Sequence, residues 1–541
     1  MSVSRLPSPD SPDTPGIPDS RQSPEGVVVG IAAVLTSSYF ATALALVRGI
    51  VVARILGPTL QGVLSVVNIV LGYASYSDLG LIAGMNKEMP RRLSQGREEE
   101  ANRLKDTAVS GALLLAGLAG LVPIAYGLLL RRHLGVPTMV GLLLSAGIIF
   151  GLQANVLYEC LLRTHKQFRL FSLVGAASAV LDFVLLIGLT WLWSIYGALG
   201  AVLLKHLLVW LIYRAVTRRL PDAPRFAFRL DLAWSRLRYL ALTGVPIAGL
   251  NLTDQFLRTA DRLAIAKLLG AHDLGFYAAG AMAAGLIYNI PRSVGWVLFP
   301  HFLAVSDPAA TADGRPADDP EIRKRYLHDQ MLSFSLFLAT MTPALTGMVY
   351  ILTPAFIHGL LNSFVPGIPA ARGQLAGMAL LSLMIPATVQ LVALNKEWWV
   401  AATRVLTAGF ILGGSAYLIR HGAGIAEVSW WMALAMLAYA PGMLLMALLA
   451  YGLSFGLALS RAFAALLPPA YCAAAVYLAE HLTHRVLFPV LGRPYTLAAL
   501  GLTALALYLV LILPLLVWAE RRFRLRLRLR GLVRRETMND E

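Results

Sequence analysis

The sequence predicts an all-α polytopic membrane protein with about 14 transmembrane helices, arranged as two six-helix lobes related by a parallel repeat, plus two extra C-terminal helices. Three observations predict this fold: an apolar composition, a series of apolar runs, and a short segment that recurs 213 residues later. Of the 541 residues, 57% are hydrophobic and 14% are charged. Soluble domains contain about 45–50% apolar and about 25% charged residues, so the composition indicates the membrane class.

The apolar runs give the elements in order. A bilayer core of about 30 Å needs about 20 apolar residues of helix, and backbone groups in lipid have to be satisfied within the segment. The expected spans are 27–47, 59–86, 106–130, 136–162, 170–193, 195–217, 239–265, 272–303, 327–352, 373–394, 398–419, 425–452, 462–484 and 495–519. The two cysteines, Cys160 and Cys472, lie inside these runs and are expected to be small buried hydrophobes.

The segments between and beyond the spans complete the organisation. The first 26 residues are rich in Pro, Ser and Asp and cannot bury a core, so they predict a disordered tail rather than a signal peptide. The expected parts are a disordered cytoplasmic tail at 1–26, an N-terminal six-helix lobe at 27–219, a basic cytoplasmic linker at 220–238, a C-terminal six-helix lobe at 239–455, helices 13 and 14 at 456–520, and a basic cytoplasmic tail at 521–541.

The net charge of +16 is best explained as a topology signal. With the N-terminus in the cytoplasm, 32 of the 46 Lys and Arg residues fall in cytoplasmic segments, 9 in outer segments and five inside spans. This bias follows the positive-inside rule and supports an even number of spans with both termini cytoplasmic. The C-terminal "RRFRLRLRLRGLVRR" fits a juxtamembrane segment attracted to anionic lipids, whereas no aromatic-rich pattern of nucleic-acid binding accompanies it.

The recurring segment is "ARILGPTLQG" at 53–62 and "AKLLGAHDLG" at 266–275. Because six spans separate the copies, the second half keeps the orientation of the first, which is a parallel repeat about an axis along the membrane normal. Gly57 and Gly270 suit helix C-caps, where glycine reaches the left-handed region easily. The second glycine of each copy is expected to permit close helix contact.

Two longer stretches carry a resemblance to a known family. "RGIVVARILGPTLQGVLSVVNIVLGYASYSDLGL" resembles the first helical hairpin of bacterial polysaccharide flippases, within the multidrug/oligosaccharidyl-lipid/polysaccharide exporter superfamily. "LTGVPIAGLNLTDQFLRTADRLAIAKLLGAHDLGFYAAG" resembles the start of their second lobe. The resemblance covers most of residues 27–455 and implies a flippase of the bacterial inner membrane that moves polyprenyl-diphosphate-linked sugars. It also implies that helices 1, 2, 7 and 8 line the cavity and that helices 13 and 14 form a groove for the lipid tail.

Ionisable residues inside the spans are the sharpest signal for a site. A charge at the bilayer centre costs about 2.5–3.5 kcal/mol on insertion scales, so such residues should face a watery cavity or one another. The five cations inside spans are Lys205, Arg258, Arg262, Arg292 and Arg404, and the five acids are Asp78, Glu159, Asp182, Asp254 and Asp261. Asp254, Arg258 and Asp261 share a helical face, which fits either a self-neutralising ladder or an arginine that turns to an anionic cargo.

A diphosphate is the cargo that fits arginines, because a guanidinium offers it fork-like bidentate contacts. The candidate substrate-binding residues are Arg48, Arg258, Arg292, Asn68, Asn251, Gln255 and Asn289. The candidates for ion coupling or charge pairing are Asp78, Asp254, Asp261 and Lys205, where Lys205 could pair with Asp182 or Glu159. Neither a cofactor nor a metal is expected, and coupling to Na⁺ or H⁺ stays open. The expected partners are a lipid-linked oligosaccharide, anionic membrane lipids, and glycosyltransferases and a polymerase of the same pathway.

Two other functions remain as alternatives. A cation-coupled multidrug exporter of the same superfamily needs a dominant acid in its cavity, whereas acids and cations are balanced here. A membrane polysaccharide polymerase or glycosyltransferase usually carries a substantial outer loop with catalytic residues. The longest outer loop here is "TPAFIHGLLNSFVPGIPAAR", and the sequence has no paired catalytic carboxylates, so we expect a transporter rather than an enzyme.

Overall fold

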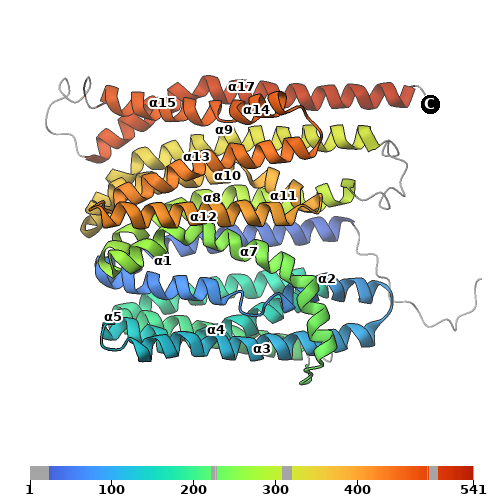
Figure 1. Ribbon diagram of the computed structural model, residues 1–541, viewed down its shortest axis with the longest axis vertical. Coiled ribbons are helices and arrows are strands. Elements are labelled where there is room, and N and C mark those ends of the chain that lie inside the picture. The colour runs from blue at the N-terminus through green and yellow to red at the C-terminus, as the bar shows by residue number, and fades with distance from the viewer. Residues whose placement is uncertain are drawn as a thin grey trace, which may run out of the picture.

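The computed structural model describes residues 24–220, 226, 228–306, 320–483, 485 and 497–539. Side chains are described for 40–220, 226, 228–289, 291–292, 331–483, 485 and 499–521. The chain is helical throughout this part (Figure 1), as the apolar runs predicted. The predicted disordered tail lies outside the described residues up to position 23, and helix α1 begins at Pro24.

The helices follow one another with short connections. Those of the first lobe are α1 (Pro24–Ala74), α2 (Leu81–Ser94), α3 (Glu98–Leu129), α4 (Val136–Thr164) and α5 (Phe168–Arg218). Those of the second lobe are α7 (Trp234–Leu268), α8 (Ala271–Ser306), α9 (Pro320–Leu360), the 3₁₀ turn η2 (Asn362–Gly367), α10 (Ile368–Ser382), α11 (Ile385–Ala393), α12 (Glu397–Arg420) and α13 (Ile425–Ala450). The C-terminal pair is α14 (Phe455–Ala464) with α15 (Leu467–Leu482), followed by α17 (Leu497–Asn539).

These helices account for the fourteen predicted spans. Within the described residues, 10 helices are long and apolar enough to cross a membrane. Two of them hold a break: α1 turns at Gly57, and α5 turns at Trp193 and Ser194, where the boundary between two spans was predicted. The charged α7 and the 36-residue α8 supply the remaining two, and both exceed the length that a bilayer requires.

Three predicted spans are not continuous helices. The span predicted at 59–86 is interrupted by a turn at 75–80 that contains Gly80 in the left-handed region. The spans predicted at 373–394 and 462–484 are interrupted just before α11 and α15, and each of these helices has a proline in its first turn. Proline lacks the N–H that a continuing helix requires, so each new helix starts there.

The duplicated segment forms the same turn twice. Gly57 has φ 68° and Gly270 has φ 93°, both in the left-handed region. The first separates the two halves of α1, and the second stands between α7 and α8. The prediction of two glycine caps is therefore confirmed.

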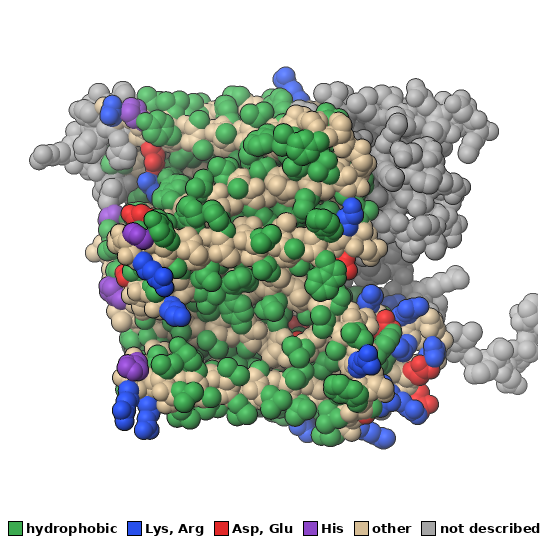
Figure 2. Space-filling model, in the orientation of Figure 1, with side chains coloured by type: hydrophobic (Ala, Val, Ile, Leu, Met, Phe, Trp, Pro, Cys, Tyr) green, Lys and Arg blue, Asp and Glu red, His purple; other side chains and the backbone are tan. Residues whose placement is uncertain are grey.

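Each lobe has its own buried apolar core. Leu81, Met85 and Leu161 belong to a core of the first lobe, and Leu375 and Met436 belong to the core of the second. A separate cluster joins α15 and α17 to α9, so the extra helices pack on the second lobe, as Figure 1 shows at the top. Hydrophobic side chains cover the middle of the face in Figure 2, and Lys and Arg gather at its lower right, over α2 and α3.

Candidate functional site

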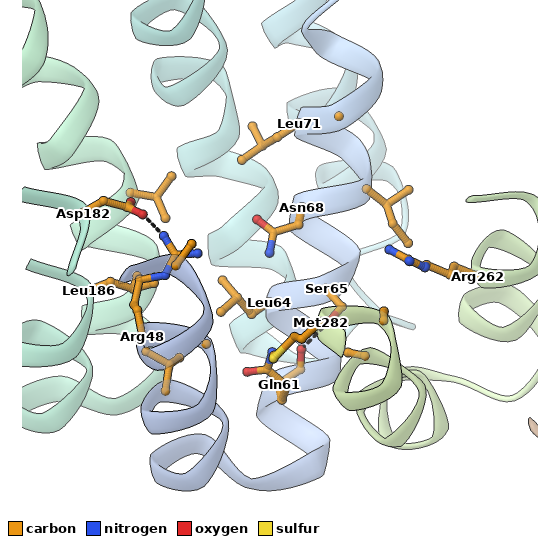
Figure 3. A pocket seen from close by; sticks show the side chains of 18 of the residues that line it. Arg48, Gln61, Leu64, Ser65, Asn68, Leu71, Asp182, Leu186, Arg262 and Met282 are labelled. Carbon is orange, nitrogen blue, oxygen red and sulfur yellow. Dashed lines mark hydrogen bonds and ion pairs between the residues drawn. The ribbon is translucent and has the colours of Figure 1, made fainter. Parts of the chain in front are cut away.

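A cavity of about 560 Å³ lies between the two lobes. Its walls come from α1, α4 and α5 of the first lobe and from α7 and α8 of the second (Figure 3). The resemblance implied a cavity lined by transmembrane helices 1, 2, 7 and 8. The lining found on α1, which contains the first two of these helices, and on α7 and α8 agrees with this. The walls contributed by α4 and α5 are an addition that the sequence did not predict.

The first-lobe wall holds two cations around one carboxylate. Lys205 Nζ lies 3.3 Å from Asp182 Oδ1, and Arg48 forms an ion pair with Asp182 Oδ2 (Figure 3). Arg48 comes from α1, and the other two residues come from α5. Asp182 was one of the two partners that the sequence allowed for Lys205. Among the residues that line the cavity, this one carboxylate faces two cations, and Glu159, the other partner that the sequence allowed, acts on Lys205 from outside the lining. The buried Nε of Arg48 has no hydrogen-bond partner in the described part of the chain.

The second-lobe wall contributes a further arginine. Arg262 of α7 points across the cavity toward the part of α1 that carries Asn68 (Figure 3). Its buried Nε has no hydrogen-bond partner, and no ion pair to its guanidinium is found among the described residues. The neighbouring Asp261 is turned away: its Oδ2 accepts a hydrogen bond from the Tyr277 hydroxyl, and its Oδ1 accepts one from the Arg262 N–H at 2.8 Å. Arg262 is thus a cation whose charge faces open space.

Uncharged polar groups complete the lining. Asn68 is exposed although it lies in the middle of α1, and Figure 3 shows it directed into the cavity. The Oε1 of Gln61 is buried without a hydrogen-bond partner in the described chain. Gln255 and Thr259 line the wall of α7. Carbonyl, amide and hydroxyl groups of this kind can donate to and accept from a sugar.

A second charged group lies on α7 and α12 of the second lobe. Asp254 Oδ2 accepts a hydrogen bond from Arg258 Nε at 2.9 Å, and its Oδ1 lies 3.4 Å from Arg404 Nη2. Each arginine has one more acceptor: Arg258 donates to Gln255 Oε1 at 3.2 Å, and Arg404 donates to the carbonyl of Leu250 at 2.9 Å. Arg258 is thus paired with Asp254, as in the first of the two interpretations of this helical face, and it is not among the residues that line the cavity.

The other predicted site residues lie outside the cavity lining. Asn251 is exposed on α7, and Asn289 and Arg292 are exposed on α8. Asp78 lies in the turn before α2, where its Oδ2 accepts a hydrogen bond from the Ile82 N–H at 2.9 Å. The structure therefore brings four of the predicted residues to the cavity: Arg48, Asn68, Lys205 and Gln255.

Several lining residues were not selected from the sequence as site residues. Arg262 and Asp182 were recognised as intramembrane charges, but the three- and four-residue spacing drew attention to Arg258 instead. Gln61 and His206 gave no signal, because a single polar residue in a long apolar helix is compatible with a packing role. No group of His, Cys, Asp and Glu that could hold a metal is found among the described residues.

Comparison with known proteins gives a family and a fold. A family model described as "Polysaccharide biosynthesis protein" matches residues 27–305. No curated protein sequence matches the chain. Among solved structures, the lipid II flippase MurJ in an inward closed conformation is similar with a TM-score of 0.63 and 12% identity, over 90% of this chain and 98% of that one. An inward-facing multidrug resistance MATE transporter of the MOP superfamily gives a TM-score of 0.59 and 16% identity, over 76% and 94%. At these identities the likeness establishes the fold.

Proposed function

The chain belongs to the polysaccharide biosynthesis protein family, and from this premise we propose that it flips a polyprenyl-diphosphate-linked oligosaccharide across the bacterial inner membrane. The head of the lipid would occupy the cavity between the lobes. The distribution of Lys and Arg favours cytoplasmic N- and C-termini, so the proposed direction is from the cytoplasmic to the outer leaflet.

The charge of the cavity carries this proposal. Its lining contains three cations, Arg48, Lys205 and Arg262, and one carboxylate, Asp182. Two positive charges in excess favour an anionic cargo, and guanidinium groups bind phosphate oxygens through paired hydrogen bonds. Because the two arginines come from opposite lobes, a diphosphate between them would contact both halves of the protein.

The size and the remaining lining fit a phosphate head followed by sugar. About 560 Å³ lies within the range of small-molecule sites, so the cavity accommodates the head and the nearest sugar rather than a long glycan. Asn68, Gln61 and Gln255 supply hydrogen-bonding groups for hydroxyls. The apolar tail would remain in the membrane, where it needs no polar contacts.

The two lobes supply the movement. Parallel repeats that meet at a central site can expose it alternately to each side by rocking as rigid bodies.

Asp182 is the sole carboxylate in the lining, and Arg48 and Lys205 already neutralise it. Coupling to Na⁺ or H⁺ through this carboxylate would have to compete with two fixed cations. Glycosyltransferases that build the lipid-linked oligosaccharide are the proposed source of cargo.

The excess of cations disfavours the two alternatives. A drug exporter for organic cations would have to bind its cargo in a cavity that repels positive charge. A polymerase or glycosyltransferase needs catalytic groups, and the described lining offers a carboxylate engaged by two cations and His206, whose Nδ1 lies 3.2 Å from Asn155 Nδ2. Transport of an anionic lipid is therefore the function that the cavity supports best.

Reconstitution into vesicles with a fluorescent polyprenyl-diphosphate oligosaccharide tests the proposal. We expect Arg262→Ala to slow flipping by about 10- to 100-fold, the effect of losing one charge-assisted contact of about 1.5–3 kcal/mol. Arg54→Ala is the matched control, because Arg54 is exposed on α1 outside the lining. Equal flipping by wild type and Arg262→Ala, or transport of an organic cation such as ethidium in place of the lipid, contradicts the proposal.

A further inference from the structure

The two copies of the duplicated segment pack against each other. Gly62 of α1 lies so close to α8 that a Cβ added to it would be 1.6 Å from the carbonyl oxygen of Ala271. Gly275 of α8 lies equally close to α1, since its added Cβ would be 1.7 Å from the carbonyl oxygen of Pro58. Pro58 and Ala271 hold the same position in the two copies, and so do the two glycines. The same contact is therefore made twice, once in each direction.

A side-chain contact marks the centre of this arrangement. Thr59 Oγ1 lies 2.9 Å from His272 Nδ1, and these residues are 213 positions apart, which is the offset of the repeat. Equivalent positions can meet only where a two-fold relation passes between them, as in the self-complementary interface of a symmetric dimer. We name the six residues Pro58, Thr59, Gly62, Ala271, His272 and Gly275 the outer clasp.

The outer clasp lies directly over the cavity. Gln61 and Leu274, the residues just before the two glycines, both line the cavity, and they too hold equivalent positions in the repeat. The distribution of Lys and Arg places these turns on the outer side of the membrane. The outer clasp therefore stands between the cavity and the outer surface on the side where α1 meets α8.

The contact is suited to repeated separation. The described contacts consist of glycine backbone against carbonyl groups and one exposed hydrogen bond, without an ion pair across the two copies. Small residues let helices approach closely, and separating the six clasp residues breaks no ion pair. The apolar residues of α1 and α8 beside the clasp, which include Ala53 with Phe276 and Ile69 with Leu274, have to part as well. By contrast, a clasp held by buried charges would have to leave each charge unpaired when it opened.

We propose that the outer clasp is the outer gate of the cavity, and that the duplicated segment was retained because it binds its own copy. Opening requires the two copies to part, and their reciprocal contacts break together. The inference rests on the proposed flipping of a lipid head, which needs an exit to the outer leaflet.

Cross-linking tests whether the outer clasp has to open. Thr59→Cys with His272→Cys is made in a chain whose two buried native cysteines, Cys160 and Cys472, are replaced by serine or alanine. After oxidation or a short bis-maleimide treatment, we expect flipping to be lost while head-group binding persists, and we expect reducing the disulfide to restore flipping. The two single-cysteine chains, treated in the same way, are the controls. If the cross-linked protein flips the lipid as fast as the untreated protein, the outer clasp is not the outer gate.

A labelling experiment tests the outer gate independently of the proposed cargo. Gln61→Cys reports access to the cavity when a membrane-impermeant maleimide is added from outside. We expect Gly62→Ala or Gly275→Ala to raise its labelling several-fold, because the added Cβ forces the copies apart, whereas Gly188→Ala, at an exposed point of α5 with open space around it, leaves labelling unchanged. If labelling rises but no lipid is flipped by wild type, the gate stands and the proposed cargo fails. If labelling does not change, the gate fails whatever the cargo is.

Discussion

The two lobes contain the same charged arrangement in two different settings. Each holds one aspartate between two cations, and the groups are Arg48–Asp182–Lys205 in the first lobe and Arg258–Asp254–Arg404 in the second. In the second lobe each arginine has a further protein acceptor, and the group lies outside the cavity lining. In the first lobe the group forms part of the cavity wall. Each group contains one buried Nε without a hydrogen-bond partner in the described chain, that of Arg48 in the first lobe and that of Arg404 in the second.

The difference teaches how to distinguish a structural charge from a functional one. Pairing with an acid does not separate them, since both groups are paired. What separates them is their position: Arg48, Asp182 and Lys205 line the cavity, whereas Arg258 and Arg404 donate to further protein acceptors outside its lining. Arg262 is the clearest case, because it lies one helical turn beyond Arg258 and yet faces the cavity without an acid partner among the described residues.

Removing the central carboxylate of each group should give the largest difference between the two groups, measured as a loss of stability. Asp254→Asn leaves two arginines inside the second lobe without their counter-charge, so we expect a loss of about 3–5 kcal/mol in the free energy of unfolding. Asp182→Asn should be milder, because the side chains of Arg48 and Lys205 are 25% and 23% exposed on the cavity wall, whereas that of Arg404 is 10% exposed. Thermal unfolding of both variants in detergent checks this, and an equal loss of stability would remove the distinction between the two groups.

A binding measurement on one arginine from each group should show the next largest effect. We expect Arg48→Gln to weaken binding of a diphosphate lipid by about 10- to 100-fold, because a charge-assisted contact contributes about 1.5–3 kcal/mol. Arg258→Gln should leave the affinity close to that of wild type, since its donors are directed to Asp254 and Gln255. Equilibrium titration in nanodiscs measures both. A larger loss with Arg258→Gln than with Arg48→Gln would place the head group in the second lobe.

The smallest effect is expected at a charged contact between the lobes, where α2 meets α7. The Glu88 carboxylate accepts hydrogen bonds from the Tyr239 hydroxyl at 2.7 Å and from Arg92 at 2.9 Å. Burial acts to raise the pKa of Glu88, but these two partners outweigh it and hold the pKa below the ordinary 4.5. The contact is therefore stabilising above pH 4.5 and is lost as the pH falls through the lowered pKa.

Comparison of wild type with Glu88→Gln isolates this contribution. We expect the variant to be less stable by about 1 kcal/mol at pH 7, the usual value of one hydrogen-bonded contact. The difference should shrink as the pH falls below about 4.5, because wild type then carries a neutral acid at the same place. Paired thermal unfolding curves from pH 7 to pH 3.5 measure it, and a difference that grows in acid contradicts the assignment.

Much of the site was visible in the sequence as a set of charges, but their grouping was not. The sequence marked Arg48, Lys205, Asp182 and Arg262 as charges in or at the ends of spans. The sequence favoured Arg258 over Arg262, because Arg258 shares a helical face with Asp254 and Asp261. Helical spacing shows which residues share a face, but it does not show where that face is directed. Which face is directed at the other lobe depends on contacts between helices that lie far apart in the chain. That orientation is absent from any local pattern.

The sequence by itself determined the spans and the two glycine turns, and it predicts the orientation of the spans. These properties depend on local composition, since each helix has to satisfy its own backbone in lipid and the basic loops set the topology. Only the tertiary structure decided which arginines face the cavity and that the two turns, 213 residues apart, contact each other. The physical reason is that a repeat fixes the shape of each copy, whereas the axis between the copies is set by packing of the whole lobes.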